Sequence, residues 1–141
     1  MWHRLYYHLI WTTKLREPLL DATAARFLSR FLRVVAAQYR VRILAVVAVR
    51  SHIHILLSGH PQTDFPKLIG HLKGGSATIW NKEYAPEEGW TLRWGQGYGL
   101  STVGRTQVEI VRAYLRAQPQ HHPLEQIEGW DGDRSSHEEL R

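Results

Sequence analysis

The stretch that most constrains the fold is 41–58, where one apolar run follows another almost at once. Residues 41–49, VRILAVVAV, are apolar at both alternating sets of positions apart from Arg42. Such a strand is buried on both faces and is expected in the middle of a sheet that helices cover. Only Arg50 and Ser51 separate it from a second run at 52–58, which favours an antiparallel hairpin.

The second run carries two histidines. His52 and His54 alternate with Ile53 and Ile55. Successive strand side chains point to opposite faces, so the two imidazoles share one face. Two imidazoles on a rigid strand pair are suited to bind one metal ion. The alternative is a pair of ordinary histidines on a half-exposed strand, and this segment alone leaves both interpretations open.

The other strands and helices predict an α+β domain. Residues 4–11 and 98–103 are expected to be strands, because aromatic and branched residues dominate the first and glycines bound the second. The predicted order is strand, helix, strand, strand, helix, strand, helix. That order is typical of an antiparallel sheet covered by helices, with the His-x-His strand in its central pair.

Three helices are expected from apolar periodicity. Asp21 and Asp64 are placed to cap the first two, and the spacing of Thr106 and Glu109 predicts a capping box before the third, at 108–117. Pro119 ends that helix. The second helix contains the pair Gly74-Gly75, which weakens it by about 1 kcal/mol per glycine relative to alanine. Such a pair indicates a close backbone approach or a break.

Length and composition favour a single folded domain. The 141 residues can bury one core, and we assign 1–124 to the domain and 125–141 to a polar, mobile tail that contains His137. Cysteine is absent, which excludes disulfides and thiolate metal sites. Without a long apolar run or a signal-peptide pattern, the sequence predicts a cytosolic protein with no membrane partner.

The charge favours a nucleic-acid partner. The net charge is +5 and the pI is near 9.8, and the chain has six tryptophans and six tyrosines. Basic surface with exposed aromatic rings suits phosphate backbones and unstacked bases. Candidate cations lie at Lys14 and Arg16 in a polar loop, at Lys73, and along the first helix at Arg26, Arg30 and Arg33. A solvated face is the alternative for the helical cations.

The last helix carries Tyr114 and Gln118. Residues four apart lie on one helix face about one turn apart. Considered alone, the pair is explained by Tyr114 as a core aromatic residue and Gln118 as a polar residue at the end of the helix. Near His52 and His54, the amide oxygen of Gln118 could complete a metal site beside the phenol of Tyr114.

Several stretches together resemble a family. They are Tyr7-His8-Leu9-Ile10-Trp11-Thr12-Thr13-Lys14, Ser51-His52-Ile53-His54-Ile55-Leu56-Leu57, Leu72-Lys73-Gly74-Gly75-Ser76-Ala77, 97–103 (GYGLSTV), and Tyr114-Leu115-Arg116-Ala117-Gln118 with His121-His122. In this order they resemble the single-tyrosine transposases of the HUH class, which include the proteins of IS200-like and REP-associated elements. The resemblance covers about residues 5–122 and implies their ferredoxin-like HUH endonuclease fold.

The resemblance implies a site and a reaction. The metal histidines would be His52 and His54, the third ligand Gln118, and the nucleophile Tyr114, which would cut single-stranded DNA and form a 5′-phosphotyrosine link. It also implies a homodimer and recognition of DNA hairpins, for which Lys14, Arg16 and Lys73 are the candidate contacts. Neutral ligands and phosphate chemistry favour weakly bound Mg²⁺ or Mn²⁺.

The chain departs from the family at the residue before the first histidine. That residue is usually acidic or an amide, whereas here it is Ser51. Two other functions stay open. One is a hairpin-DNA or RNA-binding module without chemistry. The other is a metal phosphodiesterase, whose three-histidine form would need an imidazole where this chain has Leu56. His121 or His122 could act as a base for Tyr114 only if the chain turns back after Pro119.

Overall fold

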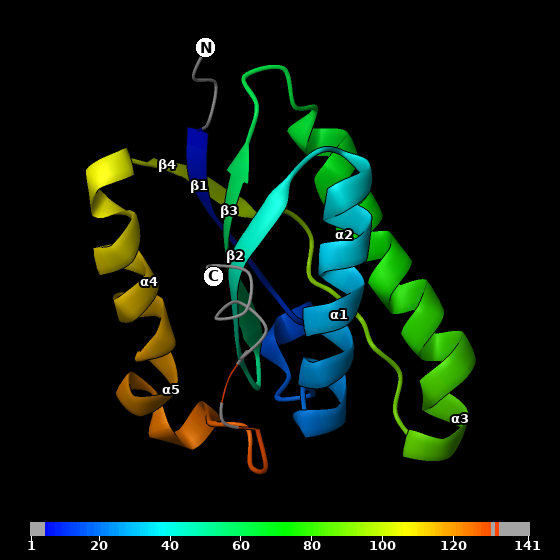
Figure 1. Cartoon of the computed structure of the whole chain (residues 1–141). Helices are drawn as coiled ribbons and strands as arrows, with labels where there is room; N and C mark the ends of the chain where they lie inside the picture. The colour runs from blue at the N-terminus through cyan, green and yellow to red at the C-terminus, as the bar shows by residue number, and fades with distance from the viewer. Residues whose placement is uncertain (1–4, 131, 133–141) are drawn as a thin grey trace.

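A four-stranded antiparallel sheet organises the protein (Figure 1). The computed structural model describes residues 5–130 and 132. The sheet order is β2-β3-β1-β4, and the strands are β1 (Leu5–Thr12), β2 (Arg42–Val49), β3 (His52–Gly59) and β4 (Gly99–Val103). The helices are α1 (Ala22–Gln38), α2 (Phe65–Ile79), α3 (Ala85–Glu88), α4 (Val108–Arg116) and α5 (Gln118–His121). None of the described helices is long and apolar enough to cross a membrane.

The topology confirms the predicted α+β class. The order strand, helix, strand, strand, helix, strand, with every sheet neighbour antiparallel, is the ferredoxin-like arrangement. The predicted hairpin is also present, because β2 pairs directly with β3.

One detail of the prediction is wrong: the strand at Arg42–Val49 lies at the edge of the sheet, and the central pair is β3 with β1. The strand is nevertheless buried along almost its whole length, because α1 covers one of its faces and α4 and α5 cover the other. Burial of a strand on both faces shows that helices cover both of its faces. It does not show whether the strand lies at the centre or at the edge of the sheet.

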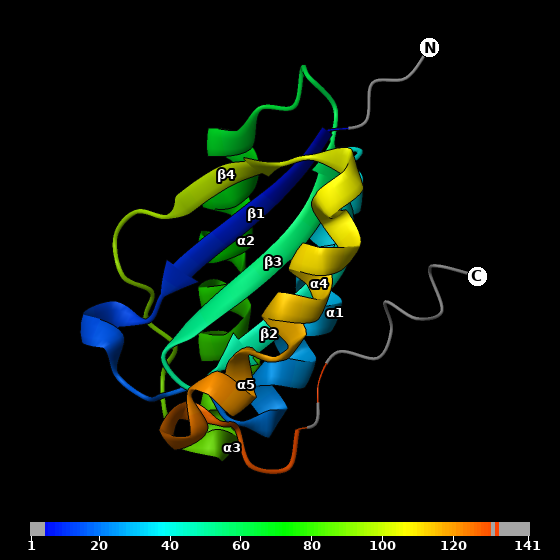
Figure 2. The ribbon, with the colours of Figure 1, turned by 90° about the vertical axis from the view of Figure 1, so that its left-hand side faces the viewer.

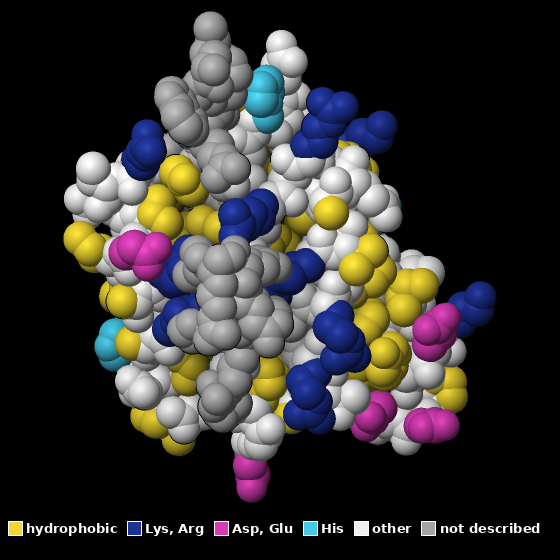
Figure 3. Space-filling model, in the orientation of Figure 1, with side chains coloured by type: hydrophobic (Ala, Val, Ile, Leu, Met, Phe, Trp, Pro, Cys, Tyr) yellow, Lys and Arg dark blue, Asp and Glu magenta, His cyan; other side chains and the backbone are white. Residues whose placement is uncertain are grey.

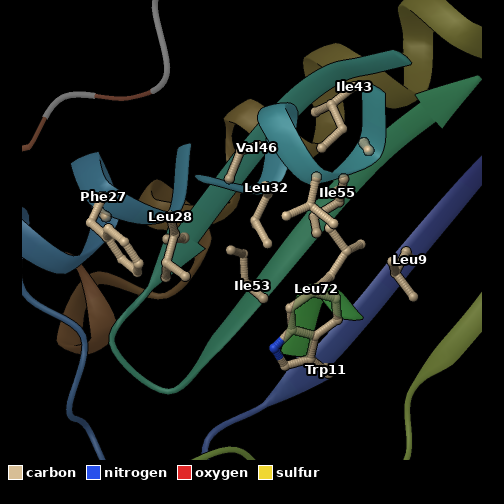
Figure 4. Packing of buried hydrophobic residues seen from close by; sticks show 14 of the residues in the cluster. Leu9, Trp11, Phe27, Leu28, Leu32, Ile43, Val46, Ile53, Ile55 and Leu72 are labelled. Atoms are coloured by element: carbon tan, nitrogen blue, oxygen red, sulfur yellow. The ribbon is translucent and has the colours of Figure 1, made fainter. Parts of the chain in front are cut away.

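The two faces of the sheet have cores of different size. The larger core lies between the sheet and α1 and α2, and Figure 4 shows Leu32 of α1 facing Ile53 and Ile55 of β3 there. The smaller core lies under α4, where Val108 and Leu115 pack on Leu56 and on part of β2. A bulge between Ile43 and Ala45 shifts the alternation of β2, so the consecutive residues Leu44 and Ala45 both belong to the smaller core.

Helix starts agree with the sequence in two cases and differ in the third. The carboxylates of Asp21 and Asp64 accept hydrogen bonds from the backbone N–H groups of Ala24 and Lys67, as caps do. The capping box predicted from Thr106 and Glu109 is wrong. A 3₁₀ turn, η3 (Arg105–Gln107), occupies that position, and no side-chain cap precedes α4.

The beginning of the predicted tail packs on the domain. Ile127 is 7% exposed within the larger core, and Trp130 packs against that core. The part of this stretch around Ile127 and Trp130 therefore packs on the core, because these two large apolar side chains interrupt an otherwise polar sequence. His137 and the other residues from 133 onward lie outside the described part of the chain.

The glycine pair in α2 marks a close approach between α2 and α1, which is one of the two explanations predicted for it. A Cβ at Gly75 would lie 2.9 Å from Cζ of Phe31 on α1, whereas a Cβ at Gly74 would meet nothing within 4 Å. The two glycines therefore have different roles although they are adjacent in one helix.

We predict opposite effects of alanine at these two positions. Gly74→Ala should raise the free energy of unfolding by about 0.5–1 kcal/mol, because alanine has the higher helix propensity. Gly75→Ala should lower it by about 1 kcal/mol, because Phe31 must shift within a packed contact. Urea unfolding of both variants measures the difference, and equal stabilisation by both would contradict the close approach.

Candidate active site

His52 and His54 lie on the face of β3 that α4 and α5 cover. In Figure 2 these helices cross in front of β3 and β2, and most of β1 and β4 is left uncovered on the same face. The alternating Ile53 and Ile55 point into the larger core on the opposite side. Because β3 is paired on both edges, the backbone that carries the histidines is held firmly.

A third histidine joins this pair from the neighbouring strand. His8 of β1 places its Nε2 2.9 Å from Nδ1 of His54, and the two rings are stacked with centroids 5.1 Å apart. His54 is 6% exposed, and its other ring nitrogen, Nε2, is buried without a hydrogen-bond partner among the described residues. A proton on Nδ1 that is donated to His8 leaves Nε2 of His54 as a free lone pair.

The environment keeps these imidazoles neutral at physiological pH. Burial lowers the pKa of His54 to about 3, and repulsion from His52, His8 and His122 acts in the same direction. Burial also lowers the pKa of His8 and of His52, although the Glu125 carboxylate opposes the shift at His52. Neutral imidazole is the form that binds a metal.

The segment from α4 to α5 folds back over this histidine cluster. The ring centroid of His122, at the end of α5, lies 6.2 Å from that of His52. The ring of His121 lies 5.8 Å from that of Tyr114 on α4. The return of the chain that a role for either histidine requires is therefore present. Helix α4 ends at Arg116, before Pro119. The chain then forms the short helix α5, in which Pro119 is the second residue.

Tyr114 is exposed, as a nucleophile must be. Val108, Arg112 and Leu115 form the buried side of α4, and this leaves the Tyr114 side chain 57% exposed. The alternative of a core aromatic residue is therefore wrong for this position. The phenol is open to a large substrate and lies in the same segment as His122, whose ring approaches His52 of β3.

Gln118 is 5% exposed and begins α5. Its backbone carbonyl accepts a hydrogen bond from the N–H of His122 at 3.0 Å, so Gln118 belongs to the turn that brings His122 to His52. This position is compatible with an amide ligand, and the ligand role of Gln118 stays a prediction.

The donor groups fit a weakly held divalent ion. Among the described residues, no group of three or more His, Cys, Asp or Glu side chains is arranged to bind a metal. The predicted site instead combines imidazoles with an amide and with oxygens from water or substrate. The buried, unpartnered Nε2 of His54 matches the first of these requirements.

The three predicted DNA contacts differ in their surroundings. Lys14 and Arg16 are exposed in the 3₁₀ turn η1 (Lys14–Arg16), which follows β1. Lys73 instead donates hydrogen bonds to the carbonyl oxygens of Gly95 and Gly97, both at 2.7 Å. It anchors the loop before β4, and burial lowers its pKa. Contact of all three with DNA stays a prediction, and a structural role is visible only for Lys73.

Basic side chains also gather on the other side of the molecule. Figure 3 shows Lys and Arg along the middle of the face on which α1 and β2 lie. On α1, Arg26 and Arg30 are exposed, whereas Arg33 is half-buried and donates to the carbonyl and hydroxyl oxygens of Ser29. For Arg33 the side-chain contacts are therefore structural, and the α1 stripe lies across the sheet from the histidines.

Two residues of this site have no role in the sequence interpretation above. His8 could have been found, because it alternates with Leu9 and Trp11 and the ferredoxin-like order places the first strand beside the third. Glu125 could not, because nothing in its sequence context indicates that the chain returns to the turn between β2 and β3.

Comparisons with known proteins agree on one family. The sequence model described as "Transposase IS200 like" matches residues 1–118. The chain is 32% identical to the ISDra2 transposase TnpA of Deinococcus radiodurans over 82% of its length and 85% of that protein. It is 28% identical to the IS200 transposase of Salmonella typhimurium over 79% of its length and 75% of that protein.

Solved structures agree in fold. A crystal structure of a protein described as a transposase from Deinococcus radiodurans aligns with a TM-score of 0.64 and 29% identity, over 84% of this chain and 93% of that one. A REP-associated tyrosine transposase bound to a REP hairpin aligns with a TM-score of 0.61 over 84% of this chain and 68% of that one. At 15% identity, this second match supports the fold alone.

The low pKa of His54 predicts a specific loss of stability in acid. In the unfolded chain this imidazole takes up a proton near pH 6.5, whereas in the folded protein it does so only near pH 3. Within that window the unfolded state binds more protons, so the free energy of unfolding should fall by up to about 1.4 kcal/mol per pH unit as the pH drops.

The measurement is urea unfolding of metal-free protein at several pH values between 6.5 and 4. His54→Gln should have a smaller slope than the wild type, because that substitution removes the titrating group. Equal slopes for the two proteins would show that burial of this imidazole does not govern the acid sensitivity.

Proposed function

The chain belongs to the IS200-like transposase family, and from this membership we propose that it cuts and rejoins single-stranded DNA through a covalent bond to Tyr114. The phenol oxygen would attack a DNA phosphorus, a 5′-phosphotyrosine bond would form, and the 3′-oxygen would leave as a free hydroxyl. Reversal with a different 3′-hydroxyl would rejoin the strand. Each step exchanges one phosphodiester for another, so no nucleotide cofactor is needed.

One observation carries the proposal. Tyr114 is exposed with its ring beside that of His121, and the next residue, His122, brings its ring to His52 of the His-x-His strand. A phenol carried by the segment that covers a cluster of neutral imidazoles suits metal-assisted phosphodiester chemistry.

We propose that His52, His54 and Gln118 bind Mg²⁺ or Mn²⁺. The ion would polarise the scissile phosphate and stabilise the charge that develops on it. All three ligands are neutral, so the protein alone supplies little attraction for a cation, and phosphate oxygens of the DNA would complete the site. Zinc would bind the imidazoles without necessarily supporting turnover.

The tyrosine needs an acceptor for its proton, because the phenol loses that proton when its oxygen bonds to phosphorus. His121 is the side chain whose ring lies beside Tyr114. We propose it as the group that accepts this proton, directly or through water.

The DNA would lie where this face of the sheet is uncovered, along β1 and β4, with Lys14 and Arg16 beside its backbone. Hairpin recognition is proposed here from the family resemblance. We also propose a homodimer, because one tyrosine forms one covalent link whereas an excised segment has two ends.

We predict that Tyr114→Phe abolishes the covalent adduct but keeps binding of hairpin DNA. The phenylalanine ring retains the packing of the exposed side chain and lacks the nucleophilic oxygen. Denaturing gel electrophoresis of a labelled oligonucleotide with Mn²⁺ measures the adduct, and a mobility-shift assay measures binding. Binding without adduct from either protein would favour a binding module, and cleavage that survives Tyr114→Phe would favour a phosphodiesterase.

Loss of a metal ligand should slow the same reaction. His52→Ala and Gln118→Ala should each reduce the rate of adduct formation by at least about 100-fold, because metal ions supply several kcal/mol of transition-state stabilisation.

In titrations with Tyr114→Phe protein, uncleaved DNA should tighten Mn²⁺ binding by about tenfold or more, which is 1.4 kcal/mol. Tight Mn²⁺ binding without DNA would contradict a site that the phosphate completes.

A further inference from the structure

The segment after α5 returns to the turn between β2 and β3. The backbone N–H of Arg50 donates to the carbonyl oxygen of Glu125 at 2.8 Å, and the N–H of Glu125 donates to the carbonyl oxygen of His122 at 2.9 Å. The second bond closes the 3₁₀ turn η4 (Pro123–Glu125), and the first ties its last residue to the strand turn. The Glu125 carboxylate is thereby placed against Ser51, the residue that precedes His52.

Ser51 connects this carboxylate to His52. Its hydroxyl, on a residue only 4% exposed, donates to Oε1 of Glu125 and also lies 3.1 Å from Nδ1 of His52. A hydroxyl has one proton, and here the carboxylate, which can only accept, takes it. The contact with His52 is therefore one in which Nδ1–H donates and the Ser51 oxygen accepts.

We propose that Glu125 is a positioning residue that acts through Ser51 to hold His52 in the Nδ1–H tautomer and so presents its Nε2 as a lone pair. The inference rests on the proposed metal role of His52. His54 has the same arrangement, since His8 occupies its Nδ1 and leaves its Nε2 unpartnered. Both imidazoles are thus bound at the same ring nitrogen and free at the other, which is how outer partners orient metal-binding histidines.

The carboxylate is needed because of the chemistry of the serine at position 51. Ser51 alone cannot determine which nitrogen of His52 carries the proton, because its hydroxyl can donate or accept. The Glu125 carboxylate removes that ambiguity. It comes from outside residues 1–118, the part of the chain that the family model matches.

The experiment compares Glu125→Ala, Glu125→Gln and Ser51→Ala with the wild type, and uses Glu128→Ala as the control. Glu128 is an exposed carboxylate on the same segment. The Arg50–Glu125 backbone bond does not involve the side chain, so the substitutions at 125 leave the segment anchored. The first readout is the ¹⁵N chemical shifts of the His52 ring in metal-free protein at a pH above 7, which report the tautomer. The second is the affinity for Mn²⁺ in the presence of hairpin DNA.

We expect a single Nδ1–H tautomer of His52 in the wild type and in Glu128→Ala. In Glu125→Ala and Ser51→Ala the ring should become a mixture of tautomers, and the Mn²⁺ affinity should fall by about tenfold or more. Glu125→Gln retains an acceptor oxygen and should lie between these and the wild type. The double variant Ser51→Ala/Glu125→Ala should be no worse than Ser51→Ala alone, because both substitutions break one relay.

Unchanged His52 shifts in Glu125→Ala would overturn the inference, and so would additive losses in the double variant. If Glu125→Ala does not fold, the shifts of Glu125→Gln and Ser51→Ala decide in the same way. The proposed function can fail separately. A tautomer change in Glu125→Ala with full adduct formation by His52→Ala would retain the relay and reject the metal role.

Discussion

Pairing between β1 and β3 is the interaction on which both the sheet and the candidate site depend. It joins the two halves of the ferredoxin-like fold and makes β3 an interior strand. The same register sets His8 diagonally across from His54, so that one ring can contact the other at 2.9 Å. A slip of β3 by one residue would turn His52 and His54 into the larger core and Ile53 and Ile55 out of it. The geometry of the site is therefore protected by the hydrophobic burial that fixes the strands.

The electrostatic character of the site follows from its neutral ligands. Burial disfavours the charged form of each imidazole, and the three rings on the sheet also repel one another when protonated. The nearest carboxylate, Glu125, is separated from the His52 ring by the Ser51 hydroxyl. A cation bound at the proposed site would gain little from the protein alone and much from a phosphate. The proposed binding of metal and the proposed binding of DNA would therefore be coupled by charge.

The sequence predicted the parts of the structure that depend on local pattern. The His-x-His strand, the hairpin before it and the caps at Asp21 and Asp64 all follow from periodicity or turn chemistry over a few residues. The edge position of β2, the packing of Ile127 and the contact of Glu125 with Ser51 do not, because each depends on where distant segments meet. The role of Lys73 belongs to the same class: its spacing indicates a free cation, and only the tertiary fold reveals two carbonyl oxygens around it.

The helical layers on the two faces of the sheet differ in how firmly they are attached. The layer with the larger core stabilises the fold, and the other layer carries the proposed nucleophile. The α1 and α2 layer is joined to the sheet by a large apolar core that includes Trp11, Leu28 and Ile53. The α4 layer rests on few apolar contacts, and its buried face includes Arg112, whose Nε has no hydrogen-bond partner among the described residues. A buried, unpaired donor costs about 1–3 kcal/mol, so it weakens this attachment. The tyrosine is therefore carried by the layer that has the smaller apolar core, while His52 and His54 are on β3, which is paired along both edges.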